Sequence, residues 1–427
     1  MAAIDRKLFL DILGFDSTSG AEKPLADFLE KALAGPVSGG VAGSTVTPRV
    51  QTWDVPEGGR NLLFSWGEPR VVFCTHIDTV PPYIPPVFPD GTPVMPDLIG
   101  HPSSEEGEPL QKTPKTSDPQ GFEAGGPSKS AENDGAPMVY GRGACDAKGQ
   151  IVALYAACRQ LASEGLDGFG LLLLSGEETG SWGAKAFAKT DFRAPYLIIG
   201  EPTEGKMVSA CKGTKAFELV FHGEAFHSGY PQFGHSAIDS FVDFVNALRA
   251  VDFGSDPELG PTTWNIGRLV SDNPQNVLSP ELHCRLYFRT TFLSDSRVEE
   301  EVKRIAGMVA APSGVRPSGS PHHSSGAVPP LPNRGCYVPQ GQHLSGSSIE
   351  VVAIGGDTPS RWFTIPGFEA APASFGSDAP HLTNFEHRTI CGAGSIRFAH
   401  RPDEQVSLGE LDEAAEHYVA MFKALQK

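Results

Sequence analysis

Short apolar runs alternate with stretches of helical periodicity through the first half of the chain. Four runs predict strands, at residues 61–65, 71–75, 170–175 and 196–200, with the first two as neighbours. Apolar positions at helical spacing predict helices over 5–35, 151–165 and 182–189. Unbroken apolar runs indicate strands buried on both faces. Strands alternating with helices predict an α/β domain, in which helices cover both faces of a largely parallel sheet.

The pattern changes after about residue 212. Residues 216–222 and 281–289 alternate between apolar and polar side chains, which is typical of antiparallel strands with one exposed face. Helical periodicity at 236–251 and 296–310 predicts two helices on one face of this small sheet. We therefore expect a second, α+β domain inserted into the first.

These patterns divide the chain of 427 residues into two domains. We expect residues 1–211 and 313–427 to form the first domain and residues 212–312 to form the insert. Two stretches, 85–137 and 312–345, are rich in Pro, Gly and Ser and contain few apolar residues. Such a composition buries too little surface to order itself, so both are predicted to be long surface loops.

Acidic residues outnumber basic ones, 51 to 34, which gives a formal charge of −17. This charge argues against a nucleic-acid partner, because phosphate binding needs a basic face. The acid excess serves either solubility or metal binding. The seven cysteines form no CxxC pair, which favours reduced thiols in a cytoplasmic protein. The N-terminus predicts an amphipathic helix, and no apolar run approaches the roughly 20 residues of a membrane span, so no membrane partner is expected.

His76 and Asp78 stand at the end of the strand predicted at 71–75. Residues two apart on a strand point to the same side. His76 can therefore bind a metal through one ring nitrogen while Asp78 supports the imidazole. Metal-bound histidines commonly have such an acidic partner. For His76 taken alone, a structural histidine remains the alternative.

Further carboxylates follow along the chain. Glu177 and Glu178 come directly after the strand at 170–175, Glu201 follows the next strand, and Asp146 stands in a Gly-rich turn. Adjacent carboxylates in a crevice raise each other's pKa. We therefore expect one of Glu177 and Glu178 to bind metal and the other to transfer protons. Taken singly, the Glu-Glu pair could be a solvated face and Glu201 could be part of a turn.

The segment 374–381 adds Asp378 and a distant histidine, His381. We favour a helix cap as the role of Asp378. The whole set, His, Asp, Glu-Glu, Glu and His, follows strand ends or Gly-rich turns, where sites form in parallel sheets. Mixed nitrogen and oxygen ligands suit zinc, with cobalt or manganese as alternatives.

Four of these segments resemble motifs of the M20 metallopeptidase family in order and in context, at 76–81, 143–149, 176–178 and 200–203. The family holds acetylornithine deacetylase, succinyl-diaminopimelate desuccinylase, aminoacylase-1 and carboxypeptidase G2. The resemblance covers most of the chain outside the two loop stretches. It implies an α/β fold of the zinc-exopeptidase type, with a phosphorylase/hydrolase-like mixed sheet. It also implies that the α+β insert is ferredoxin-like and serves as a lid and dimerisation domain.

The resemblance implies two zinc ions per chain, with Co²⁺ or Mn²⁺ as possible replacements. Residue by residue, His76 and Glu201 are expected to hold one zinc. Glu178 and His381 are expected to hold the other, with Asp146 as the bridge between them. The peptide bond after Asp146 is cis in relatives of this kind.

Three further roles are implied by the resemblance. Asp78 is expected to orient His76, and Glu177 to act as the general base. His227 resembles a histidine that stabilises the oxyanion, often in the active site of the partner subunit, although a plain turn histidine is the alternative.

Asn276 and Arg289 resemble residues that face the substrate in relatives. Arg289 is available for a two-point grip on an α-carboxylate, and a salt-bridged strand residue is the alternative. The tail at 394–404 resembles the acetylornithine deacetylase branch.

The leading functional hypothesis is removal of an acyl group from an N-acyl amino acid, such as acetylornithine. Succinyl-diaminopimelate desuccinylase and an M20 dipeptidase or carboxypeptidase are the alternatives. The expected partners are thus a small N-acyl amino acid or short peptide, and a second copy of the chain bound through the insert. From other classes, a non-catalytic binding protein with the same fold and a structural scaffold remain open.

Overall fold

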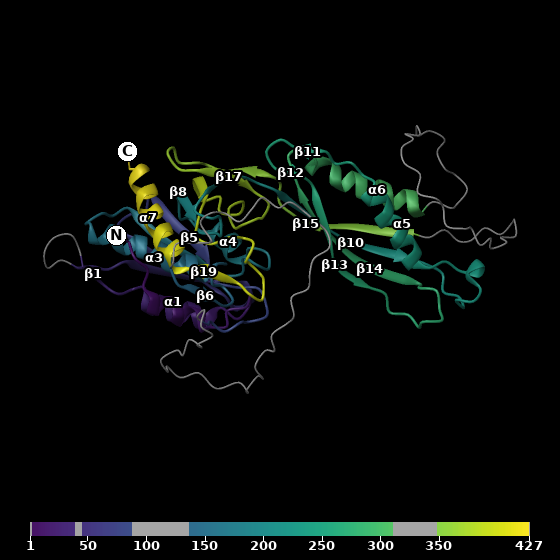
Figure 1. Cartoon of the computed structure of the whole chain (residues 1–427), viewed down its shortest axis with the longest axis horizontal. Coiled ribbons are helices and arrows are strands. Elements are labelled where there is room, and N and C mark those ends of the chain that lie inside the picture. Colours follow the sequence, from purple (N-terminus) through teal and green to yellow (C-terminus); the bar gives the residue numbers. More distant parts are fainter. Residues whose placement is uncertain (1, 39–44, 88–135, 311–347, 427) are drawn as a thin grey trace, which may run out of the picture. The chain divides into compact units, whose positions relative to one another are not determined.

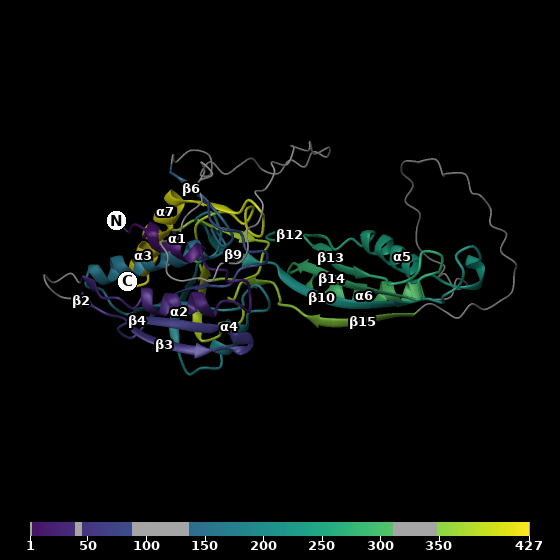
Figure 2. The same cartoon turned by 90° about the horizontal axis from the view of Figure 1, so that it is seen from below.

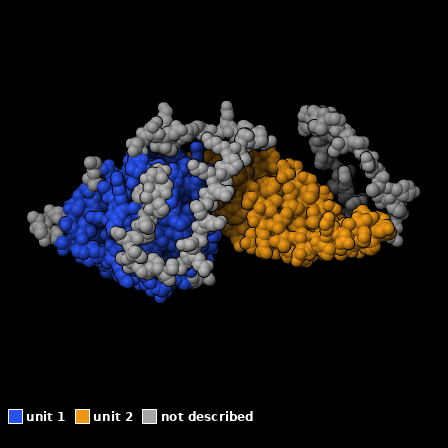
Figure 3. All heavy atoms as spheres, turned by 60° about the horizontal axis from the view of Figure 1, so that its bottom comes forward, with its two compact units in different colours: residues 1–209, 362–371, 377–427 blue, residues 210–361, 372–376 orange. Residues whose placement is uncertain are grey.

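The computed structural model describes residues 2–38, 45–87, 136–310 and 348–426. The loops predicted at 85–137 and 312–345 lie largely outside the described residues. The chain forms two compact units (Figure 3): unit 1 has residues 1–209, 362–371 and 377–427, and unit 2 has residues 210–361 and 372–376. Among the described residues, no helix has both the length and the apolar character needed to cross a membrane.

A six-stranded mixed sheet forms the centre of unit 1 (Figure 1). Its strands are β3 (Arg49–Asp54), β4 (Arg60–Trp66), β5 (Val71–His76), β7 (Phe169–Leu174), β8 (Ala194–Ile199) and β18 (Phe385–Ile390). They stand in the order β18-β8-β5-β7-β4-β3, and the first four run parallel. All residues of β5 and β7 are buried, as their continuous apolar runs predicted.

The strand β7 lies between β4 and β5, which the sequence predicted to be neighbours. β4 pairs antiparallel with β7, and β5 pairs with the other side of β7 in parallel. Parallel neighbours need a long crossover connection, which here contains the helix α3 (Lys148–Ser163). The strand that pairs with β5 here, β7, therefore comes from much later in the sequence than β4 does. The strands β4 and β3 follow β7 at one edge of the sheet (Figure 2).

Helices cover both faces of the sheet, as predicted. The helices α1 (Arg6–Leu13), α2 (Lys23–Ala32), α3 and α7 (Leu408–Ala424) share one apolar core with alternate strand residues such as Phe64 and Phe73. The helix α4 (Trp182–Phe187) lies on the opposite face, where the side-chain amide of Asn61 donates to the carbonyl of Gly183 at 2.8 Å.

Local sequence signals explain where two of these helices begin. The side chain of Asp5 accepts the backbone N–H of Leu8 at the start of α1. Ser407 and Glu410 form a reciprocal capping box at the start of α7. Such caps satisfy N–H groups that the first helical turn leaves without partners. The shorter elements of the chain are β1 (Val37–Ser38), β2 (Thr45–Val46), η1 (Pro56–Gly58), β6 (Met138–Tyr140), β9 (Met207–Cys211), η2 (Pro231–Phe233), β11 (Ser255–Asp256), β12 (Gly260–Pro261), β16 (Ser360–Arg361), β17 (Ala370–Ala373) and β19 (Gln405–Ser407).

Unit 2 holds an antiparallel sheet with helices on one face. Its strands are β10 (Gly213–His222), β13 (Thr263–Val270), β14 (Glu281–Thr290) and β15 (Ser348–Gly355), in the order β13-β14-β10-β15. The buried side chains of β14 alternate with exposed ones and pack against α5 (Ala237–Arg249) and α6 (Asp295–Ala310). This is the α+β arrangement that the alternating pattern predicted.

The insert is longer than the predicted 212–312. The strand β15 pairs with β10, and its residues Ile349 and Val351 pack against the core of unit 2. The chain returns to unit 1 at Trp362 and not at residue 313. An edge strand gains its partner only in the folded sheet, so the apolar pattern of 348–355 gave no sign of which domain it joins.

Candidate metal centre

The carboxyl ends of three parallel strands bring the predicted acidic ligands together with His76. His76 is the last residue of β5, Glu177 and Glu178 lie in the loop after β7, and Glu201 lies in the loop after β8. Parallel strands end at the same edge of a sheet, and ligand sites commonly form there. This common edge explains how residues far apart in the sequence come to share one site.

Two groups of possible metal ligands share Asp146. One ligand atom each of His76, Asp146 and Glu201 lies within 4.8 Å of the others, and the same holds for Asp146, Glu178 and His400. His76 Nε2 lies 3.1 Å from Asp146 Oδ1. His400 Nε2 lies 3.3 Å from Asp146 Oδ2 and 3.0 Å from Glu178 Oε1. Asp146 therefore turns one carboxylate oxygen towards each group, as a bridging ligand would.

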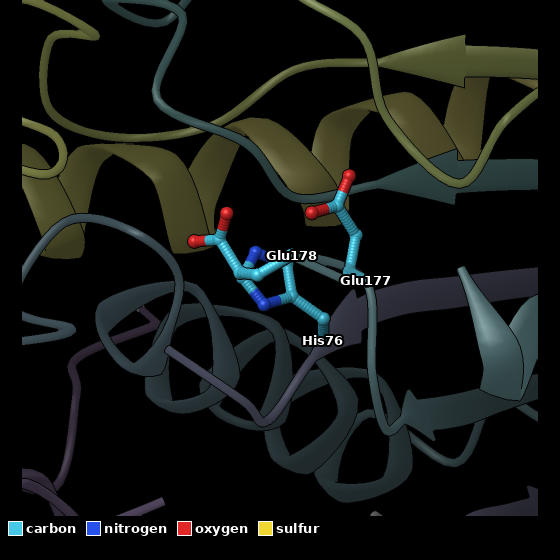
Figure 4. A group of neighbouring side chains, drawn as sticks. All are labelled: His76, Glu177 and Glu178. Carbon is cyan, nitrogen blue, oxygen red and sulfur yellow. The ribbon is translucent and has the colours of Figure 1, made fainter. Parts of the chain in front are cut away.

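Glu177 lies at the same cluster in a third group, with His76 and Glu178. Figure 4 shows the two glutamates leaving one loop beside the His76 ring, with their carboxylates turned in different directions. This divergence fits two different tasks for the two neighbouring acids.

Asp78 is fully buried and forms hydrogen bonds to the segments that carry the cluster. Its Oδ1 accepts the backbone N–H of Glu177 at 3.0 Å, and its Oδ2 accepts the N–H of Glu178 at 3.1 Å and the hydroxyl of Ser19 at 2.7 Å. His76 Nδ1 lies 3.4 Å from Asp78 Oδ1 and 3.0 Å from its backbone oxygen. This is the geometry expected of a residue that orients His76, and it also fixes the loop of Glu177 and Glu178.

Asp146 stands in the turn between β6 and α3, and the peptide bond that joins it to Ala147 is cis. The resemblance had implied this bond. The backbone N–H of Asp146 donates to Glu404 Oε1 at 3.1 Å. Glu404 was not among the predicted site residues.

Burial and crowding shift the pKa of the acidic side chains at this site. Burial raises the pKa of the Glu177 and Glu201 carboxyls well above their usual range, and neighbouring carboxylates add to the rise. Burial also raises the pKa of Asp378 to about 7. Groups of buried carboxylates that resist ionisation favour a bound cation, which compensates their charge.

Carboxylates of the same cluster raise the pKa of both His76 and His400. Burial opposes the charged form of His76, but hydrogen bonds to Asp146 and Asp78 outweigh it and raise the pKa of His76 well above its usual value. Hydrogen bonds to Asp146 and Glu178 raise the pKa of His400 to about 10. Protons on the histidines thus neutralise part of the negative charge that a metal ion would otherwise balance.

The second histidine of the cluster is His400, where the sequence predicted His381. No group of possible metal ligands among the described residues includes His381, which lies in a turn and donates its backbone N–H to the carbonyl of Asp378 at 3.0 Å. Asp378 is likewise no helix cap, since this turn and not a helix follows it. The sequence signal that could have found His400 is its place in the segment 394–404, which resembles a branch of the family.

The predicted substrate residues His227, Asn276 and Arg289 lie in unit 2. The segments of His227 and Asn276 come together, since the backbone N–H of Ser228 donates to the carbonyl of Asn276 at 2.9 Å. Arg289 lies on β14, and its guanidinium carbon stands 5.2 Å from the ring centre of Tyr287. Among the described residues, its side chain thus makes a cation–π contact.

The comparison with known proteins identifies the family. The model of peptidase family M20/M25/M40 matches residues 114–424. The chain belongs to this M20 peptidase family. It is 27% identical to a probable carboxypeptidase from Aspergillus terreus, over 97% of this chain and 84% of that protein.

Solved structures of M20 peptidases have the same fold. A tripeptidase from Staphylococcus aureus aligns with a TM-score of 0.64 at 15% identity, covering 98% of this chain and 97% of that one. A protein from Bacillus subtilis, described as a dinuclear metal-binding peptidase of the M20 family, aligns with a TM-score of 0.55 at 12% identity and covers 97% and 95% of the two chains. These likenesses confirm the predicted fold class, and the family model confirms the predicted family, so the chain is an M20-family hydrolase.

Proposed function

We propose that this chain is a dinuclear metallopeptidase that cleaves the amide bond next to a free carboxylate, as a carboxypeptidase does. The observation that carries the proposal is the placement of Asp146, whose two carboxylate oxygens face His76 and His400 at 3.1 and 3.3 Å. Family membership and the similarity to a protein named as a probable carboxypeptidase support it.

The donor set fits two divalent cations. His76, Glu201 and Asp146 would hold one, and Asp146, Glu178 and His400 would hold the other. Imidazole and carboxylate donors suit zinc, with cobalt or manganese as alternatives. When bound, such cations polarise a substrate carbonyl and lower the pKa of water.

The chain's own residues then move the protons. Glu177 lies beside His76 and Glu178, where it can take a proton from the attacking water and give it to the leaving amine. Asp78 keeps His76 and the loop of Glu177 in place through its buried hydrogen bonds. His227 is proposed to stabilise the oxyanion, and Asn276, which neighbours its loop, to contact the substrate.

A free carboxylate is the feature that the candidate substrates share. The C-terminal residue of a peptide and an N-acyl amino acid both present an α-carboxylate next to the scissile amide. Arg289 is proposed to bind it. Burial lowers the pKa of the nearby Lys212, and the charge of Arg289 lowers it further, so two cationic side chains lie close enough to interact. Deacylation of acetylornithine remains the second candidate, favoured by the resemblance of the segment 394–404.

Two further features of the assembled protein are proposed. The helix α5 exposes Ile238 and Val242 one turn apart, which supports a homodimer formed through the insert. The six described cysteines are buried and free of disulfide bonds, in keeping with the predicted cytoplasmic location.

The test is a hydrolysis assay on short peptides with free C-termini, acetylornithine and succinyl-diaminopimelate, with and without a chelator. We expect chelation to abolish cleavage and zinc to restore it. Glu177→Ala should keep both metals by elemental analysis while kcat falls by about 10²–10⁴-fold, the usual contribution of a general acid–base group. Substantial turnover by Glu177→Ala would contradict the assignment, and a metal-loaded wild type that cleaves none of these substrates would favour the binding-protein hypothesis.

A further inference from the structure

A buried ion pair lies next to the metal centre and is not part of its ligand set. Arg142 Nη1 donates to Glu404 Oε2 at 2.6 Å, and the two side chains are 2% and 1% exposed. Desolvation of two buried charges offsets much of their attraction, so such a pair is weak evidence of a role in stability. Its hydrogen bonds to the segments of the proposed ligands suggest a different role.

The carboxylate of Glu404 holds the turn that carries Asp146. Its Oε1 accepts the backbone N–H of Cys145 at 3.2 Å and that of Asp146 at 3.1 Å. The backbone carbonyl of Glu404 also accepts the N–H of Gly141 at 3.0 Å. Both ends of the turn are thus fixed to one residue, which sets the direction in which Asp146 leaves the backbone.

Arg142 connects the same turn to the segment of His400. Its Nη1 also reaches the carbonyl of Arg401, at 3.3 Å, and the N–H of Glu404 donates to that carbonyl at 3.3 Å. His400 itself has a φ of +65°, a left-handed conformation that a non-glycine residue keeps only where its surroundings enforce it. The hydrogen bonds to the Arg401 carbonyl help to hold this conformation, together with the hydrogen bond from the N–H of Arg401 to the carbonyl of Phe398 at 3.4 Å.

We propose that Arg142 and Glu404 form a positioning pair that presets Asp146 and His400 to receive the cation they share with Glu178. The proposal rests on the proposed metal-dependent function. Partners that orient metal ligands typically contribute about 10- to 100-fold to metal affinity. The pair ties together two segments far apart in the sequence, so one ion pair serves two ligands of the same cation.

The test compares cobalt and zinc titrations of the full-length chain with those of Glu404→Gln. We expect two cations to bind the wild type. In the variant, the affinity for the second cation, the one assigned to Asp146, Glu178 and His400, should fall by about 10- to 100-fold. The cobalt absorption spectrum of that site should also change. The cation held by His76, Glu201 and Asp146 should be affected less, since it shares Asp146 with the pair's network but not His400. Arg60→Met is the matched control: it breaks ion pairs with Asp27 and Asp54 in the same unit and should leave both affinities unchanged.

Glu404→Gln leaves Arg142 buried without its counter-charge, which could unfold the chain. The double variant Arg142→Met/Glu404→Gln avoids this problem, because replacing both members of a buried pair is often neutral for stability. It should fold and still lose affinity for the second cation. A folded double variant that binds both cations as the wild type does would overturn the proposal, and so would a double variant that fails to fold in saturating zinc. Metal affinity is measured apart from turnover, so a wild type that binds two cations but cleaves no substrate would refute only the proposed function.

Discussion

Replacing Asp78 by asparagine tests whether a carboxylate that is hydrogen-bonded to the ligand-bearing loop sets the geometry of the metal centre. The two oxygens of Asp78 accept the backbone N–H groups of Glu177 and Glu178 at 3.0 and 3.1 Å. The side chain of asparagine has only one oxygen, so one of these backbone N–H groups would face the side-chain NH2 group of the asparagine instead. The loss of one hydrogen bond to a charged group costs about 1.5–3 kcal/mol, and the loop that carries Glu177 and Glu178 would shift.

We expect Asp78→Asn to bind zinc about 10- to 100-fold more weakly than the wild type, the usual effect of losing an orienting partner. Isothermal titration with zinc measures the affinity, and kcat/KM on the best peptide substrate measures the effect on turnover. Asp256→Asn is the matched control, since Asp256 is a buried carboxylate of unit 2 that likewise accepts three hydrogen bonds, all of them from backbone N–H groups. Equal zinc affinity in Asp78→Asn and the wild type would refute the reasoning.

Two further predictions separate ligands from structural residues. His400→Ala should lose one of two bound cations by elemental analysis, whereas His381→Ala should keep both; the opposite result would restore the assignment made from sequence. Asp256→Asn should unfold at a lower urea concentration than the wild type at pH 7, because hydrogen bonds from three backbone N–H groups hold the pKa of this carboxyl below its usual range despite its burial. Since the folded pKa is lowered, this stabilisation is full above the unfolded pKa of about 3.9 and is lost as the pH falls through the folded value, so a difference that persists unchanged at pH 2 would contradict it.

The proposed ligands at strand ends were predictable, because the apolar runs fix where each strand ends. His76 ends one such run, Glu178 and Glu201 lie just after two others, and the parallel sheet brings these ends to one edge. Relations between distant segments were not predictable in this way. The insertion of β7 between β4 and β5 depends on a pairing that no local pattern specifies. The choice of His400 over His381 depends on how the segment before β19 enters the site, and the apolar pattern carries no information on that.

The buried acids of this site divide by what compensates their charge. Asp78 accepts hydrogen bonds from Ser19, Glu177 and Glu178, and Glu404 accepts them from Arg142 and two backbone N–H groups. Such donors favour the charged form of a buried carboxylate and lessen its need for a cation, although burial and Asp146 still raise the pKa of Glu404. Glu201 is grouped instead with a histidine and another carboxylate, so its charge remains to be balanced. This difference separates the acids that we assign to support from an acid that we assign to metal binding, and it does so independently of any family motif.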